Sequence, residues 1–84
     1  MDRARRLQAF IKSSTIRKRV FDLVLSANEF VSPIEISRRS KLSVSLVTRA
    51  LGQLEKEGLV ENLTPGKPSW KLYAPTELAG SLFE

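Results

Sequence analysis

The sequence of 84 residues contains no cysteine and no histidine. The lack of cysteine excludes disulfides, thiolate metal sites and thiol nucleophiles. The lack of histidine removes the commonest metal ligand and a common general base. The four glycines do not form a phosphate-binding loop. From these absences we expect a protein that is not an enzyme and that holds no metal and no cofactor.

Long hydrophobic runs are also missing. No apolar stretch approaches the roughly 20 residues that a membrane-spanning helix needs, and neither end has the pattern of a secretory signal. We therefore expect a cytoplasmic protein with no membrane partner. The length suits one small domain, residues 1–84, because it is too short for a second hydrophobic core.

The charge of the chain is unevenly distributed. The net charge is +5, and residues 1–20 contain seven basic residues and a single acid. The rest of the chain contains seven basic and eight acidic residues. A basic balance suits a polyanion such as DNA or RNA, or an anionic membrane surface. A merely solvated basic surface explains the charge equally well, so the charge alone leaves the partner open.

The first third of the chain predicts helices. Asp2 is suited to cap a helix that runs to residue 12, and Ser14 is suited to cap the next one. Apolar residues then recur on one face until Asn28, which is a typical stop. The polar segment 13–15 leaves two readings open, namely two helices or one helix with a loosened joint.

A short helix and a turn follow. Residues 29–31 are long enough only for a brief strand. A capping box with proline at the first helical position then predicts a helix from Ser32 to about Arg39. We expect this helix to bury Ile34 and Ile36 or their neighbours.

The segment 43–58 has the pattern of an amphipathic helix. Ser43 is its predicted cap, and Gly58 is suited to end it in the left-handed conformation. The residues predicted to be buried recur at a spacing of 3.6: Val47, Ala50, Leu51 and Leu54.

After Gly58 the apolar period changes to that of strands. The segments 59–63 and 69–73 flank the turn pair Pro65-Gly66 and predict a β-hairpin. Thr76 is suited to cap a short helix at the C-terminal end. We expect the aromatic residues Trp70 and Tyr73 to belong to the core rather than to stack on bases.

The order of these elements is that of a winged helix-turn-helix. The stretch "SVSLVTRALGQLEKEGLV" also resembles the recognition-helix segment of MarR- and ArsR-type regulators, with a serine cap, a valine–Ser/Thr–Arg step and "L..LE..GLV". "SPIEISRRSKLS" is similar to the preceding helix and turn. We therefore predict a mostly α member of the α+β class, a three-helix core with a two-stranded β-hairpin wing and short terminal helices. The core spans 14–73, the N-terminal helical extension 1–13 and the C-terminal helix 74–84.

The helix over 43–57 has an outward face with small hydroxyls and one arginine. On a helical wheel Ser45, Thr48, Arg49 and Gly52 lie opposite the apolar stripe, and no acid precedes Glu55. In a helix-turn-helix the start of the second helix enters the major groove, where an arginine can bind guanine O6 and N7. The pattern therefore predicts a DNA-reading helix.

Leu46 lies at the margin of that face. It can meet a thymine methyl group or pack against a neighbouring helix, and both readings stay open.

Ser43 is a candidate for phosphate contact besides its role as a cap. The other candidates for contact with DNA are basic residues of the turn and the wing: Arg38, Arg39, Lys41, Lys67 and Lys71. For Arg38, Arg39 and Lys41 a favourable interaction with the helix C-terminus is an alternative or additional role. The two lysines of the wing can equally be solvated charges.

Some features of the families that this chain resembles are absent from it. Metal-sensing ArsR-type proteins use cysteine and histidine ligands, and neither residue is present here. MarR-type regulators dimerise through long terminal helices. We therefore expect a homodimer through apolar residues of both ends, which have little core left to join: Leu7, Phe10, Ile11, Leu82 and Phe83.

The function predicted from the sequence is that of a sequence-specific transcriptional regulator. It would bind double-stranded DNA with residues 43–57 in the major groove and with residues 59–73 on flanking DNA. The resemblance implies a prokaryotic protein of archaeal type. The alternative is a winged-helix module for protein–protein interaction within a larger assembly.

Overall fold

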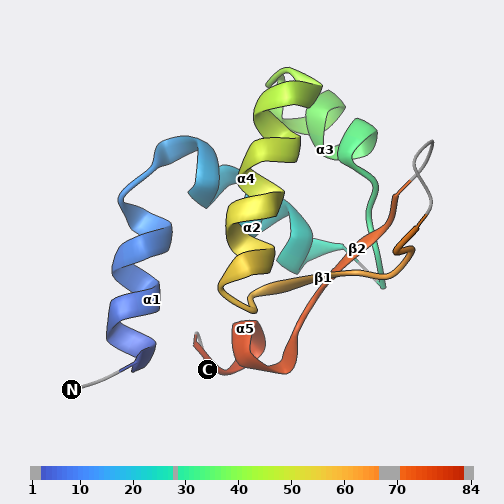
Figure 1. Cartoon of the computed structure of the whole chain (residues 1–84). Coiled ribbons are helices and arrows are strands. Elements are labelled where there is room, and N and C mark those ends of the chain that lie inside the picture. The colour runs from blue at the N-terminus through green and yellow to red at the C-terminus, as the bar shows by residue number, and fades with distance from the viewer. Residues whose placement is uncertain (1–2, 28, 67–70, 83–84) are drawn as a thin grey trace.

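The computed structural model describes residues 3–27, 29–66 and 71–82. Figure 1 shows helix α4 in front of α2, with α1 on one side and the hairpin on the other. The elements in chain order are α1 (Arg3–Lys12), α2 (Thr15–Ser26), α3 (Pro33–Ser40), α4 (Val44–Lys56), β1 (Val60–Asn62), β2 (Tyr73–Pro75) and α5 (Glu77–Ser81). This order confirms the predicted fold, mostly helical with a two-stranded antiparallel hairpin.

Helices α1 and α2 are two separate helices. Ser14 lies between them in an extended conformation, and its hydroxyl oxygen accepts a hydrogen bond from the backbone N–H of Arg17 at 3.2 Å. This bond satisfies a donor of the first turn of α2, which has no partner within the helix. The predicted cap Asp2 and the predicted stop Asn28 lie outside the described residues, and α2 ends at Ser26.

Helix α3 begins as predicted but buries only one of its two isoleucines. Ser32 caps it by accepting from the N–H of Glu35 at 3.1 Å, and Pro33 occupies the first turn. Ile36 is fully buried, whereas Ile34 is 56% exposed, so the expectation that Ile34 is buried is wrong. Two positions along a helix lie about 200° apart, so a short helix cannot turn both side chains to the same core.

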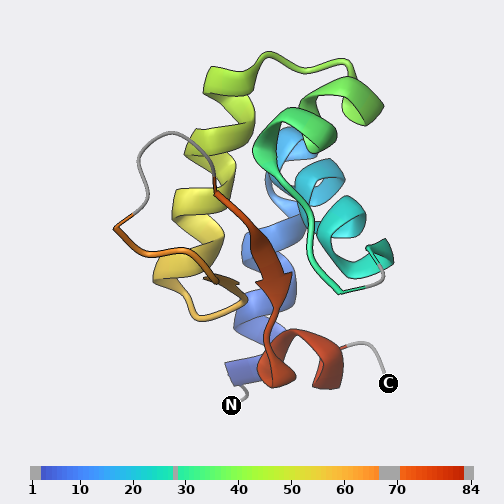
Figure 2. The same ribbon diagram turned by 90° about the vertical axis from the view of Figure 1, so that its right-hand side faces the viewer.

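Helix α4 is the central helix of the domain. Its four predicted core residues are all buried, and it packs against α2, α3 and β1. Gly58 ends the helix with φ of +77°, and the N–H of Leu59 bonds to the carbonyl of Leu54 at 2.9 Å. A left-handed glycine therefore reverses the chain into β1, as predicted. Figure 2 shows α4 and the hairpin side by side, seen from the side of the hairpin.

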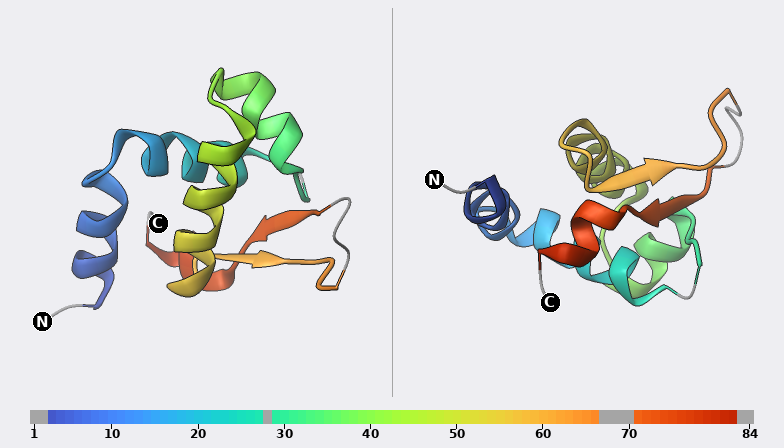
Figure 3. Two further views of the ribbon diagram at one scale, coloured as in Figure 1. Left: turned by 45° about the horizontal axis from the view of Figure 1, so that its top comes forward. Right: turned by 90° about the horizontal axis from the view of Figure 1, so that it is seen from below.

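The second strand of the hairpin differs in part from the predicted one. Of the strand predicted over 69–73, residues 69–70 lie outside the described residues, Lys71 and Leu72 belong to no strand, and Tyr73 begins β2, which runs to Pro75 and pairs antiparallel with Val60–Asn62. Tyr73 also exchanges two backbone hydrogen bonds of 2.9 Å with Val31. Tyr73 is thus held between β1 and the segment before α3, which fixes where β2 can lie. Figure 3 shows the hairpin projecting from the helices, on the side away from α1.

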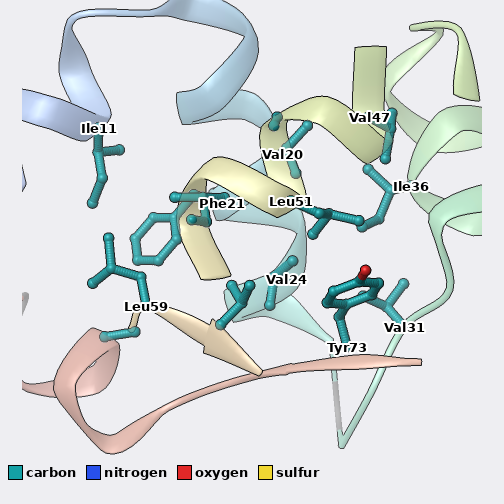
Figure 4. Close-up of a cluster of buried hydrophobic side chains, with 14 of the residues drawn as sticks. Ile11, Val20, Phe21, Val24, Val31, Ile36, Val47, Leu51, Leu59 and Tyr73 are labelled. Carbon is teal, nitrogen blue, oxygen red and sulfur yellow. The ribbon is translucent and has the colours of Figure 1, made fainter. Parts of the chain in front are cut away.

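A single hydrophobic cluster joins every helix to the hairpin. Figure 4 shows Phe21 of α2 between Ile11, Leu51 and Leu59. Tyr73 is also buried, which confirms that it is a core residue, whereas Trp70 lies outside the described residues. Within the described part of the chain, no helix is long and apolar enough to cross a membrane.

The residues proposed for dimerisation lie mostly in this core. Leu7, Ile11 and Leu82 are buried within the chain itself, so the premise that they have little core left to join is wrong. Helix α1 packs against α2, and Gln8 Nε2 of α1 donates to the carbonyl of Leu82 at 2.7 Å. Phe10 is partly buried against the same cluster, and Phe83 lies outside the described residues.

Candidate nucleic-acid interface

The turn between α3 and α4 is held by serine hydroxyls. Lys41 adopts the left-handed conformation with φ of 63°, and its N–H bonds to the carbonyl of Ser37 at 2.9 Å. The hydroxyl of Ser37 donates to the carbonyl of Leu42 at 2.5 Å, and Ser40 Oγ accepts from the N–H of Leu42 at 3.2 Å. Because backbone groups on both sides of Lys41 are satisfied, the turn fixes the direction of α4 relative to α3.

A residue of α2 supports the same turn. Arg19 Nη1 donates to the carbonyl of Ser40 at 3.0 Å, at the C-terminal end of α3. A cation at this end also interacts favourably with the helix dipole. The sequence reasoning missed this role, since the two residues are 21 positions apart and only the packing of α2 on α3 brings them together.

The start of α4 is capped and exposed. Ser43 lies in an extended conformation, and its Oγ accepts from the N–H of Leu46 at 3.2 Å. This confirms Ser43 as the cap, whereas its contact with a phosphate stays a prediction. Serine at this position satisfies one of the donors that the first turn of the helix leaves without a partner.

The outward face of α4 is open to solvent along its front half. Ser45, Thr48, Arg49 and Gly52 are all exposed. The side chain of Arg49 has no hydrogen bond or ion pair with any residue in the described ranges. A Cβ atom added at Gly52 would meet no atom within 4 Å, so the fold itself does not require glycine there. This face is therefore available to a partner, and its only charge before Glu55 is positive.

The basic residues at the end of α3 are exposed but engaged. The carboxylate of Glu35 contacts Arg38 at 3.4 Å and Arg39 at 2.8 Å. Exposed ion pairs contribute little to stability and are easily exchanged for other partners. Both arginines thus lie beside the helix-turn-helix, with a single acid neutralising part of their charge.

The two basic residues predicted for the wing are Lys67 and Lys71. Lys71 is half-buried and lies just before β2 rather than on a strand, which corrects the predicted position of this residue. Lys67 lies outside the described residues. Gly66 has φ of +86°, as a turn with glycine at its third position requires.

The basic run 17–19 does not form one patch, as expected for neighbours on a helix. Arg17 lies over the ring of Phe10, and its Nε donates to Gln53 Oε1 at 3.1 Å. Lys18 pairs with Asp22 at 2.7 Å. Since Arg19 is bound to the turn, the three cations of the run have three different partners and form no common surface.

A hollow of about 200 Å³ lies between the start of α2 and the outward side of α4. Its lining mixes polar and apolar side chains from both helices: Ser14, Ile16, Arg17, Leu46, Arg49, Ala50 and Gln53. Leu46 is 38% exposed, so it is not closed off by the neighbouring helix. The hollow thus extends the exposed face of α4 towards α2.

Tyr73 is a buried titratable group at the start of β2. Burial raises the pKa of its hydroxyl, and the negative charge of Glu55 raises the pKa further. Both effects disfavour the phenolate. Tyr73 therefore stays neutral under ordinary conditions and acts as a packing residue of β2.

Comparison with known proteins identifies the fold described above. Residues 15–61, more than half of the chain, match the family described as winged helix-turn-helix DNA-binding. The chain belongs to this family. The match covers α2, the helix-turn-helix and β1, so the predicted resemblance to winged-helix regulators is confirmed. This chain is thus a winged helix-turn-helix DNA-binding protein.

Solved structures of several bacterial proteins share the fold. HlyU of Vibrio cholerae superposes with a TM-score of 0.72 at 21% identity, over 94% of this chain and 81% of its own. The ferric uptake regulator Fur of Helicobacter pylori gives 0.69 at 30% identity, over 84% of this chain and 53% of its own. A mutant of Escherichia coli MarR, in complex with operator DNA, gives 0.58 at 18% identity, over 92% of this chain and 66% of its own.

The search of curated proteins found no matching sequence. The winged helix-turn-helix chain spans most of HlyU but only about half of Fur. The similarity to HlyU and MarR therefore describes the fold, and the contacts that this chain makes with DNA have to be argued from its own residues.

Proposed function

We propose that this chain is a sequence-specific transcriptional regulator that inserts the start of α4 into the major groove of double-stranded DNA. The observation that carries the proposal is the exposed, acid-free front half of α4, in which the side chain of Arg49 has no partner among the described residues. A helix fixed by a braced turn can present such a face without reorganisation. Because the helix is already ordered before it binds, the entropic cost of binding is small.

Each side chain of the face has a role in this proposal. Arg49 binds guanine through O6 and N7, because its two parallel donors match these two acceptors. Ser45 and Thr48 are short enough to allow close approach, and their hydroxyls bond to base edges or phosphates. Gly52 leaves room for the sugar–phosphate backbone, which accounts for a glycine that the fold does not need.

Phosphate contacts flank the reading helix. The side chain of Lys41 has no partner among the described residues, and Arg38 and Arg39 can exchange Glu35 for phosphate oxygens. Lys67 and Lys71 would bind on the other side, from the wing. Such contacts position the protein on the duplex without carrying sequence information.

The partner and the assembly belong to the same proposal. The E. coli MarR neighbour was solved with operator DNA, which supports double-stranded DNA as the partner. A homodimer would read half-sites about one helical turn apart. Since Leu7, Ile11 and Leu82 are buried, a dimer needs other residues at its interface. The role requires no enzymatic activity and belongs in the cytoplasm of a prokaryotic cell.

Binding to a mixed pool of duplex DNA across a salt titration tests this proposal. The plot of log affinity against log salt should fall with a slope of about −0.9 for each phosphate neutralised. If all five candidate cations bind phosphates, the slope should be about −4.5 for each chain bound. A folded sample that binds the pool undetectably, or with no salt dependence, would contradict the proposal and favour the protein-interaction alternative.

A further inference from the structure

The first turn of α4 carries two exposed aliphatic side chains. Val44 is 45% exposed and Leu46 is 38% exposed. Aliphatic surface in water is unfavourable, and on a DNA-reading helix it gains free energy only if the DNA offers an apolar group. The two side chains differ in what lies beside them.

Leu46 stands next to Arg49. The two positions are three residues apart, so they lie about 60° from each other around the helix, whereas Val44 lies about 140° from Arg49. Leu46 and Arg49 also line the same hollow between α2 and α4. When one base pair lies against Arg49, the adjacent base pair of the duplex therefore lies near Leu46.

The major groove presents one apolar group on its base edges, the C5-methyl group of thymine. From this chemistry and from the exposure of Leu46 we propose that Leu46 reads a thymine through its methyl group, beside the guanine bound by Arg49. The inference rests on the proposed function and adds a specificity-determining residue to it. It also states part of the target, a T·A pair adjacent to the G·C pair.

The spacing along the helix supports adjacent pairs. Three residues of α-helix rise by about 4.5 Å, and consecutive base pairs are separated by about 3.4 Å. The two lengths agree to within the reach of an arginine side chain. The cap also fixes the backbone at Leu46, since the N–H of this residue donates to Ser43.

Replacement of thymine by deoxyuridine in the DNA tests the inference, because the two nucleotides differ only in the methyl group. The preferred duplex is first selected from a random library, and each of its thymines is then replaced in turn. For the unsubstituted protein, one replacement in each half-site should weaken binding about fourfold, which corresponds to the roughly 0.8 kcal/mol of one buried methyl group. That thymine should adjoin the guanine whose preference Arg49→Ala abolishes.

The variant Leu46→Ala should remove this penalty. It should bind the thymine duplex about fourfold more weakly, and it should not distinguish thymine from deoxyuridine at that position. Val44→Ala is the matched control, an exposed aliphatic residue on the same turn, and it should retain the penalty. Thermal unfolding of both variants checks that each is folded.

The possible failures are distinguishable. If Leu46→Ala keeps the full deoxyuridine penalty, or if no thymine shows a penalty in the unsubstituted protein, the role of Leu46 is overturned while DNA binding stands. If the library yields no preferred duplex, the proposed function fails first and the role of Leu46 fails with it.

Discussion

The guanidinium of Arg17 lies 4.0 Å from the centre of the Phe10 ring, while its Nε donates to Gln53 at 3.1 Å. Arg17 Nη1 also donates to the hydroxyl of Ser13 at 3.1 Å. One side chain of α2 therefore joins the N-terminal helix α1 to helix α4, which we propose to be the DNA-reading helix. As a result α1 is part of the folded domain, and Arg17 links its position to that of α4.

We expect Arg17→Ala to lower the free energy of unfolding by about 1–3 kcal/mol. The variant loses a cation–π contact and several hydrogen bonds of a partly buried side chain. Urea unfolding followed by circular dichroism measures the loss. Lys18→Ala is the matched control, because Lys18 makes only an exposed pair with Asp22 and should change stability by less than about 0.5 kcal/mol. Equal effects of the two variants would contradict the role of Arg17.

Leu7→Ala should act on stability. Leu7 is fully buried among core residues, so its truncation should cost about 2–5 kcal/mol through lost burial and a cavity. Chemical unfolding gives the cost, and light scattering at the same concentrations gives the molecular mass. Ala4, an exposed residue of the same helix, supplies the control Ala4→Ser. A variant with unchanged stability but a lower mass than the unsubstituted protein would restore Leu7 to a dimer interface.

Two serines of the reading helix should separate stability from binding. Ser43→Ala removes the cap of α4 and should lower the free energy of unfolding by about 1 kcal/mol. Ser45→Ala removes an exposed hydroxyl, and since alanine has the higher helix propensity, stability should not fall. DNA affinity of Ser45→Ala should nevertheless decrease. Loss of stability in Ser45→Ala, or none in Ser43→Ala, would reverse these assignments.

The domain should lose stability at high pH, partly through Tyr73. Because burial and Glu55 raise the pKa of Tyr73, the unfolded chain releases the phenol proton at lower pH than the folded chain does. Stability therefore falls as the pH rises above about 10, where tyrosine ionises in the unfolded state. Tyr73→Phe should make the fall shallower between about pH 9 and 11. Parallel curves over this range would exclude the contribution of Tyr73.

The local features of the fold could be predicted from the sequence. Ser14, Ser32, Ser43 and Thr76 all cap helices, and each accepts a bond from an N–H three residues ahead. Such bonds depend on a few neighbouring residues. The buried stripe of α4 was equally predictable, because the period of its apolar residues reports which side faces the core.

Features set by distant segments could not be predicted in the same way. The position of β2 depends on Tyr73 pairing with Val31, which lies far from it in the sequence. The burial of Leu7 depends on how α1 folds back on the domain, and the apolar spacing of α1 is compatible with a dimer interface as well. For the site, the exposed face of α4 was predicted, whereas the brace from Arg19 to the turn needed the packing of α2.

The most direct test of the account is the selection of duplexes from a random library by the unsubstituted protein and by Arg49→Ala. Arg5→Ala is the matched control, since Arg5 is also exposed and has no partner among the described residues, but lies on α1. We predict that Arg49→Ala relaxes the preference for guanine at one position of each half-site, at a cost of about 1–3 kcal/mol for the original site. Arg5→Ala should select the same sequence as the unsubstituted protein. An unchanged preferred sequence for Arg49→Ala would contradict the claim that α4 reads DNA through Arg49.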